Sequence, residues 1–160
     1  MPAMILRSAL LAATLAALAS LSSPSLAQDA AAAKPGDPAA PAPAPATKQR
    51  AVFAISDADP QKWNLVLGNV GNALDGIGAP NADFELVVYG PAIAMLKKDS
   101  SVADRVAATV ARGVHVVACR NSMRGAHIEA SDLLPGVDTV ASGVVELIRL
   151  QLAGWAYVRS

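Results

Sequence analysis

Short apolar runs alternate with amphipathic segments along the chain after residue 50. Residues 51–55 are a continuous apolar run, which is typical of a strand buried on both faces, and the mainly apolar runs at 84–89 and 114–119 predict two more strands. Weaker runs at 137–140 and 155–158 predict two further strands. The pattern therefore predicts about five strands.

Segments with apolar residues at three- and four-residue spacing separate these strands and predict helices. The first helix begins with Asp59 as its N-cap and Pro60 at its first position, and Gly76 and Gly78 end it. A second over 102–112 is followed by Gly113, a common residue just past a helix end. The others are a short helix from Gly90-Pro91 through Leu96, one that opens within 120–125, and one after Ser142 that carries Val144, Val145, Ile148 and Leu152 on one face and ends at Gly154.

Strands that alternate with helices predict the α/β class. We expect a small, open and mostly parallel sheet with helices on both faces. In such sheets, ligands bind beyond the carboxyl ends of the strands, where the connecting loops form a crevice. We therefore look for functional residues at strand ends.

The first 50 residues differ in composition from the rest. Residues 1–27 contain Arg7, an apolar Ala/Leu run and the small-x-small sequence Ser25-Leu26-Ala27, which predict a signal peptide cleaved after Ala27. Residues 28–50 are rich in Ala and Pro and predict a disordered linker. We expect a chain exported to the periplasm, with no membrane span in its mature part and one domain over 51–160.

Charge and composition exclude several functional classes. The chain has 13 Lys and Arg residues against 13 Asp and Glu residues, and it lacks the basic stripe with interleaved aromatic residues of a nucleic-acid-binding protein. One cysteine and two histidines are too few for a zinc or haem site, so we expect no metal or cofactor. The sequence contains neither a phosphate-binding loop nor a nucleophile elbow.

Cys119 is the candidate reactive residue, because it ends the strand at 114–119. A helix start at Asn121 or Ser122 would direct the positive end of a helix dipole at the sulfur, and Arg120 and Arg124 would add positive charge. These groups would stabilise the thiolate, which is the nucleophilic form. An unpaired cysteine in an exported protein suggests a free reactive thiol or intermolecular pairing. The alternative is an inert core cysteine beside solvated arginines.

The two histidines are weaker candidates. His115 precedes Cys119 by four residues on one strand, which separates them by about 13 Å, so we predict a structural role for His115. His127 follows Cys119 by one loop and could approach the sulfur as a base.

The segment around Cys119 resembles the DsrE/DsrF-like (TusD-related) family. The residues that carry the resemblance are Val116 to Gly125, Val87 to Pro91, Val144 to Gln151, Gly154 to Tyr157, and Asn69 and Asn72 in the first helix. The resemblance covers nearly all of 51–160 and implies the same α/β sheet, assembly into homo-oligomers (trimers or hexamers), and a persulfide on the cysteine that matches Cys119. In sulfur-relay members, that persulfide passes to an acceptor protein.

Two hypotheses follow. In the first, the protein is a periplasmic sulfur carrier in which Cys119 is the persulfide-bearing nucleophile, with Arg120, Asn121, Ser122 and Arg124 stabilising the anion and other proteins as sulfur donor and acceptor. In the second, it is a non-catalytic oligomeric binding or assembly module, and Cys119 is a packing residue.

Overall fold

Five strands lie side by side in the order β4-β3-β2-β1-β5, and every neighbouring pair is parallel. A computed structural model describes residues 47–159 of the chain. The strands are β1 (Gln49–Ile55), β2 (Ala82–Val88), β3 (His115–Cys119), β4 (Val137–Val140) and β5 (Ala156–Arg159). The predicted α/β class and parallel sheet are confirmed. The predicted signal peptide and all but the last few residues of the predicted linker lie outside the described residues.

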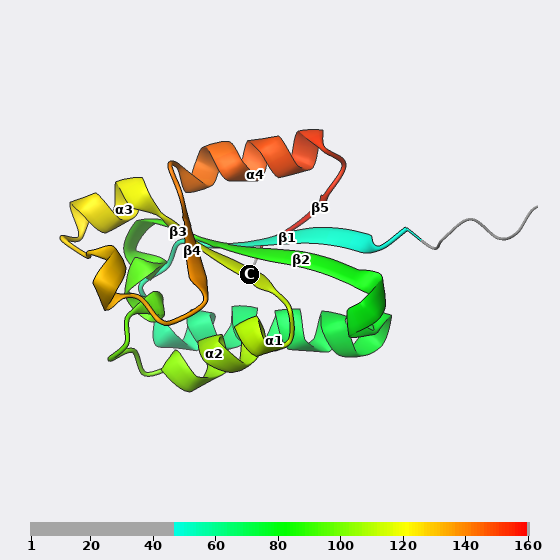
Figure 1. Ribbon diagram of the computed structural model, residues 1–160, viewed down its shortest axis with the longest axis horizontal. Helices are drawn as coiled ribbons and strands as arrows, with labels where there is room; N and C mark the ends of the chain where they lie inside the picture. The colour runs from blue at the N-terminus through cyan, green and yellow to red at the C-terminus, as the bar shows by residue number, and fades with distance from the viewer. Residues whose placement is uncertain (1–46, 160) are drawn as a thin grey trace, which may run out of the picture. The chain divides into compact units, whose positions relative to one another are not determined.

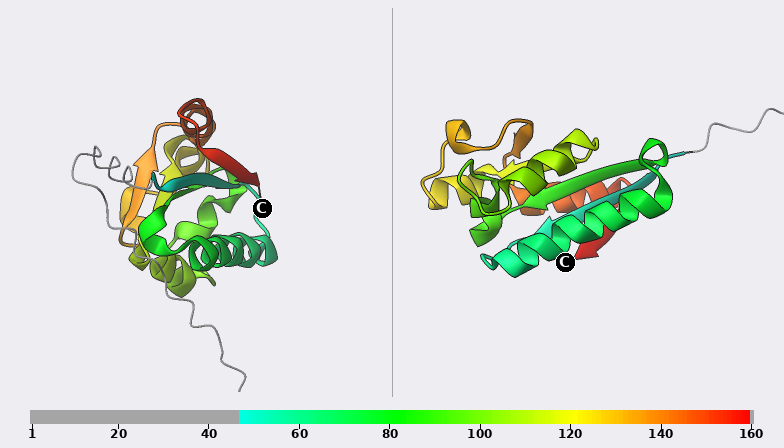
Figure 2. Two further views of the ribbon diagram at one scale, coloured as in Figure 1. Left: turned by 90° about the vertical axis from the view of Figure 1, so that its right-hand side faces the viewer. Right: turned by 90° about the horizontal axis from the view of Figure 1, so that it is seen from below.

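Helices cover both faces of this sheet (Figure 1). The helices are α1 (Pro60–Ile77), α2 (Ala103–Ala111), α3 (Arg120–Gly125) and α4 (Gly143–Leu152), with 3₁₀ turns η1 (Ala79–Asn81), η2 (Gly90–Leu96) and η3 (Ala130–Asp132). Helices α1 and α2 lie on one face and α4 on the other, and the view along the strands shows the same separation (Figure 2, left). Helix α3 continues directly from β3 at the carboxyl end of the sheet.

The two faces of the sheet bury cores of different size. On the face toward α1 and α2, Phe53 and Phe84 meet edge to face with ring centroids 5.4 Å apart, and side chains from both helices complete a large apolar cluster. On the face toward α4, a smaller cluster consists of Val52, Ala54, Val87, Val117, Leu147 and Leu150. Because successive strand residues point to opposite faces, a strand between two cores must be apolar at nearly every position. This explains the mainly apolar runs in the sequence.

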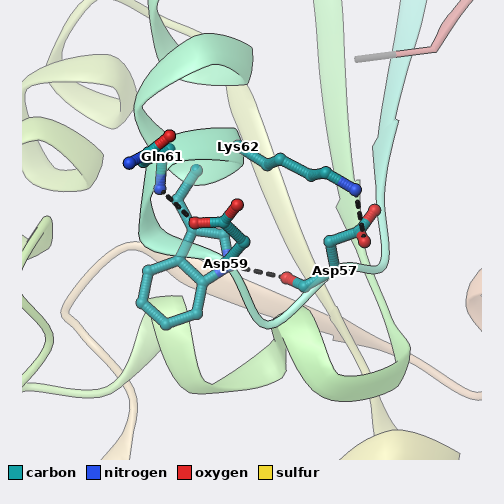
Figure 3. A network of polar contacts seen from close by, with 5 residues as sticks. Asp57, Asp59, Gln61 and Lys62 are labelled. Atoms are coloured by element: carbon teal, nitrogen blue, oxygen red, sulfur yellow. Dashed lines mark hydrogen bonds and ion pairs between the residues drawn. The ribbon is translucent and has the colours of Figure 1, made fainter.

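Helix α1 begins at the residues that the sequence predicted. The Asp59 side chain accepts a 2.8 Å hydrogen bond from the Gln61 backbone N–H (Figure 3). Pro60 occupies the first helical position. The Trp63 indole donates to the Asp57 carbonyl at 2.7 Å, and Lys62 pairs with the Asp57 carboxylate at 2.6 Å. These contacts fix the loop that leaves the carboxyl end of β1.

Some boundaries differ from the prediction. Strand β1 begins at Gln49, before the predicted start of the domain, and the predicted short helix through Leu96 is the 3₁₀ turn η2. The apolar face of α4 that the sequence singled out is exposed, because the helix packs on the sheet through its other side, at Gly143, Leu147 and Leu150. Within residues 47–159, no helix has both the length and the apolar character that crossing a bilayer requires.

Candidate functional site

Cys119 is the last residue of β3, as the sequence predicted, and α3 begins at the next residue. Cys119 itself therefore occupies the N-cap position of α3. The prediction that Asn121 or Ser122 caps this helix was wrong, because no loop separates the strand from the helix. Both residues lie in the first turn of α3, where backbone N–H groups have no partner within the helix.

Four hydrogen-bond donors surround the sulfur of Cys119. Burial raises the pKa of the Cys119 thiol, since the side chain is 4% exposed, but hydrogen bonds outweigh this effect and hold the pKa below its ordinary value. The donors are the Ser122 hydroxyl and the backbone N–H groups of Gly143, Ser122 and Asn121. A thiolate gains more from such donors than a thiol does, so the site favours the anionic form.

The Ser122 hydroxyl links the sulfur to the end of β2. Its oxygen accepts a 2.7 Å hydrogen bond from the Gly90 backbone N–H, which begins η2. Since a hydroxyl oxygen can accept and donate at once, its own proton remains available to Cys119. The Gly90 N–H, the Ser122 hydroxyl and the sulfur therefore form a short chain of hydrogen bonds across two strand ends.

Gly143 supplies a further donor from a different helix, and the sequence pattern did not indicate it. It is the first residue of α4, and its N–H points to Cys119. A Cβ atom at this position would lie 3.0 Å from Tyr89 Cβ and 3.3 Å from Cys119 Cβ, which is tighter than ordinary van der Waals contact, so a larger residue would require its neighbours to shift by a few tenths of an ångström. The sequence held one signal for this contact. Gly143 directly follows Ser142, the predicted N-cap of the helix after the strand at 137–140.

The two arginines predicted to stabilise the sulfur lie on α3 with exposed side chains. The Arg124 guanidinium donates to the side-chain oxygen of Asn121. Arg120 and Arg124 both line a cavity of about 630 Å³ beside α3. Asn121 therefore has two roles, since its backbone N–H faces the sulfur while its side chain orients an arginine.

Neither histidine is among the hydrogen-bond partners of the sulfur. His115 is exposed at the first position of β3, at the end of the strand away from Cys119, which agrees with its exclusion as a catalytic partner. His127 follows α3 and lines the same cavity as the arginines. Its backbone φ of 54° lies in the left-handed region, which is uncommon for a residue other than glycine.

A second perturbed group lies in the middle of the sheet. Burial raises the pKa of Glu85, on β2, to about 7, and the nearby carboxylate of Glu146 adds to the rise. One carboxyl oxygen of Glu85 is buried without a hydrogen-bond partner among the described residues. Glu85 lies beside His115, at the opposite end of β3 from Cys119. The four residues between these levels span about 13 Å along the strand, so Glu85 is a separate feature from the sulfur site.

Fold and site together define a class, namely a parallel α/β protein with a hydrogen-bonded cysteine at the carboxyl end of a central strand. The sequence profile of the DsrE/DsrF-like family matches residues 49–159. The chain belongs to this family, as its resemblance predicted. No curated protein sequence matches the chain.

Solved structures share the fold. A protein of unknown function from Methanobacterium thermoautotrophicum, MTH1491, is 34% identical, with a TM-score of 0.68 over 71% of this chain and 100% of that one. The ychN protein of E. coli is 21% identical, with a TM-score of 0.59 over 70% and 99% of the two chains. BT1422 from Bacteroides thetaiotaomicron, a conserved protein of unknown function, is 12% identical, with a TM-score of 0.56 over 68% and 92%.

Proposed function

We propose that this protein is a sulfur carrier in which Cys119 holds a persulfide. The observation that carries the proposal is the position of Cys119 at the end of β3 and the start of α3, among donors from α3, α4 and the Ser122 side chain that hold the pKa of its thiol below the ordinary value. Membership of a family whose fold is related to sulfur relay supports it. The same donors that stabilise a thiolate would stabilise a persulfide anion on the same residue.

The transfer step needs no cofactor. The Cys119 thiolate attacks the outer sulfur of a donor persulfide R–S–SH, the donor S–S bond breaks, and R–S⁻ leaves while Cys119–S–SH forms. A thiolate on an acceptor protein then takes the outer sulfur by the same reaction and releases the Cys119 thiolate. Each step exchanges one S–S bond for another, so no external oxidant or reductant is consumed.

Mass spectrometry tests the carrier function directly. Incubation of the protein with polysulfide should add the mass of one sulfur atom to the peptide containing Cys119, and a reductant should remove it. Cys119→Ser should abolish the addition and retain the fold, because oxygen replaces sulfur at nearly the same volume. If the wild-type protein gains no sulfur, or gains it equally well when unfolded, the folded site has no carrier role.

One observation favours the second hypothesis, a binding or assembly module with a structural cysteine. The Cys119 side chain is 4% exposed, as a packing residue would be. Slow alkylation of Cys119 in the folded protein, together with fast alkylation after unfolding, would support this alternative.

We also propose that the carrier acts outside the cytoplasm as a homo-oligomer. The composition of residues 1–27 supports export, and the exposed apolar face of α4 supports self-association.

Amino-terminal sequencing of the exported protein should begin at Gln28 or within a few residues of it. Intact Met1 in the exported pool would contradict cleavage.

A further inference from the structure

The cavity beside α3 has the size and lining of a small-molecule site. Its volume of about 630 Å³ lies within the range of ligand pockets in proteins. Helix α3 contributes Arg120, Met123 and Arg124, and the segment after it contributes His127, Ile128 and Glu129. The lining therefore combines two guanidinium groups with apolar side chains.

The cavity keeps a net positive charge, because two arginines and one carboxylate, that of Glu129, line it. Neither Arg120 nor Arg124 forms an ion pair within residues 47–159. Arg124 is oriented by Asn121, whose amide carries no charge. The Glu129 carboxylate already accepts the backbone N–H of Asp132 in a capping box. A ligand in the cavity would therefore meet guanidinium hydrogen-bond donors and a net positive charge.

The apolar part of the lining restricts the ligand further. Met123 is buried and belongs to the large core, and Ile128 packs against the same core, so both are held in place. A simple inorganic anion would leave this apolar surface exposed to water. A ligand with an anionic group for the arginines and a short apolar body for Met123 and Ile128 would satisfy both parts.

We propose that this cavity binds a small organic anion, a carboxylate or sulfonate with a short apolar chain. The guanidinium groups of Arg120 and Arg124 hold the anionic group, because guanidinium donors match the geometry of carboxylate and sulfonate oxygens. The proposal assigns the arginines a ligand of their own and does not rest on sulfur transfer at Cys119.

Titration of the full-length, ¹⁵N-labelled protein with four probes of equal chain length tests the proposal. Hexanoate and hexanesulfonate should shift the amide signals of residues 120–130, whereas hexanol and hexylammonium should bind at least about tenfold more weakly. Arg120→Gln and Arg124→Gln should each weaken hexanoate binding by about tenfold. Both side chains are exposed, so these variants should keep the dispersed amide spectrum of the folded protein.

Arg112→Gln is the matched control, because Arg112 lines a different cavity, between α1 and α2, and pairs with Asp75. It should leave hexanoate affinity unchanged. Equal affinity for hexanol would show an apolar groove without anion recognition and would overturn the proposal. Preferential binding of hexylammonium, an equal loss in the Arg112 variant, or the absence of shifts in 120–130 would overturn it as well.

Discussion

At the scale of single residues, Ser122 contributes to the sulfur site through both hydrogen-bonding roles of its hydroxyl. The oxygen accepts from the Gly90 N–H at 2.7 Å, and the proton is directed at Cys119. The first contact ties η2 to α3, and the second stabilises the thiolate. Loss of the hydroxyl should therefore affect both stability and reactivity.

Ser122→Ala should raise the pKa of the Cys119 thiol, because the thiolate loses a side-chain donor. Alkylation of Cys119 near neutral pH should slow by about fivefold, and unfolding should become easier by about 1 kcal/mol, since the Gly90 N–H loses its acceptor. The pH dependence of the alkylation rate and a denaturant titration measure the two effects. Ser101→Ala, at an exposed serine remote from the sulfur in sequence, is the control. An unchanged pH–rate profile would contradict the role of the hydroxyl.

Gly143→Ala should disturb the site from the side of α4. The added methyl group would meet Tyr89, Val87 and Cys119 at 3.0 to 3.3 Å, so α4 and these neighbours should separate by a few tenths of an ångström, which lengthens the contact from the Gly143 N–H to the sulfur. We expect a loss of about 1 to 3 kcal/mol in the free energy of unfolding and a rise in the thiol pKa. Denaturant titration measures the free energy of unfolding, and the pH dependence of the alkylation rate measures the thiol pKa.

Gly76→Ala is the control for this substitution, because an added Cβ at Gly76, within α1, meets nothing within 4 Å. It should be neutral or slightly stabilising, since alanine is the better helix former. Equal effects of the two substitutions would show that crowding at Cys119 is not the cause.

Glu85 makes stability depend on pH in a defined range. Burial, the largest cause, and the nearby Glu146 raise its pKa to about 7 from an ordinary value of 4.5. Between these values the unfolded chain has lost the proton that the folded protein keeps, so stability falls as pH rises and levels off above pH 7. The pKa of Glu146 is lowered by Arg149, so its own contribution is lost at pH values below 4.5 and leaves this range unaffected.

Glu85→Gln should remove the loss of stability between pH 4.5 and 7, because the amide stays neutral at every pH in that range. At pH 8 the variant should be more stable than the wild type by on the order of 3 kcal/mol. Thermal unfolding across pH 4 to 8 measures the difference. Asp138→Asn, at an exposed carboxylate on β4, should keep the wild-type dependence. A parallel decline in Glu85→Gln would mean that another group titrates.

At the scale of elements, the pattern of apolar residues predicts the segments that supply the buried cores. It does not predict which side of a helix packs or where a helix begins. The strands β1, β2 and β3 were predictable because both of their faces are buried, which leaves a mainly apolar run interrupted in β2 by Glu85. Helix α4 carries apolar residues on two sides, so spacing alone could not show that Leu147 and Leu150 pack on the sheet while Val145 faces outward. The start of α3 was misplaced because no turn residue marks it.

The same limit applies to the site. Cys119 could be found from the sequence because it ends an apolar run. Its contact with Gly143 depends on how the chain returns through β4, which is paired with β3, and no local pattern encodes that return. The residues of one turn, Asn121 and Ser122, were therefore predictable as neighbours, whereas the donor from α4 was not.

At the scale of the whole molecule, α4 presents an apolar surface that the described chain does not cover. Val145 is 63% exposed and Leu152 is 84% exposed, and Val144 and Ile148 on the same helix are each about half exposed. Exposed apolar residues in a cluster mark interaction surfaces more often than scattered ones do. Since α4 also supplies the Gly143 donor, a copy bound to this surface would lie near the sulfur site.

We expect a trimer or larger assembly of the mature protein in solution, as the family resemblance implies, with the outer face of α4 in the contact. Light scattering at micromolar concentration measures the mass. Val145→Lys combined with Ile148→Lys should reduce it to that of a smaller species, because each ammonium would have to be buried in the contact. Both positions are exposed in the single chain, so folding should be little affected. Leu65→Lys, at a 53% exposed leucine on α1, should leave the mass unchanged. A wild-type monomer, or a double variant of unchanged mass, would exclude this face as the contact.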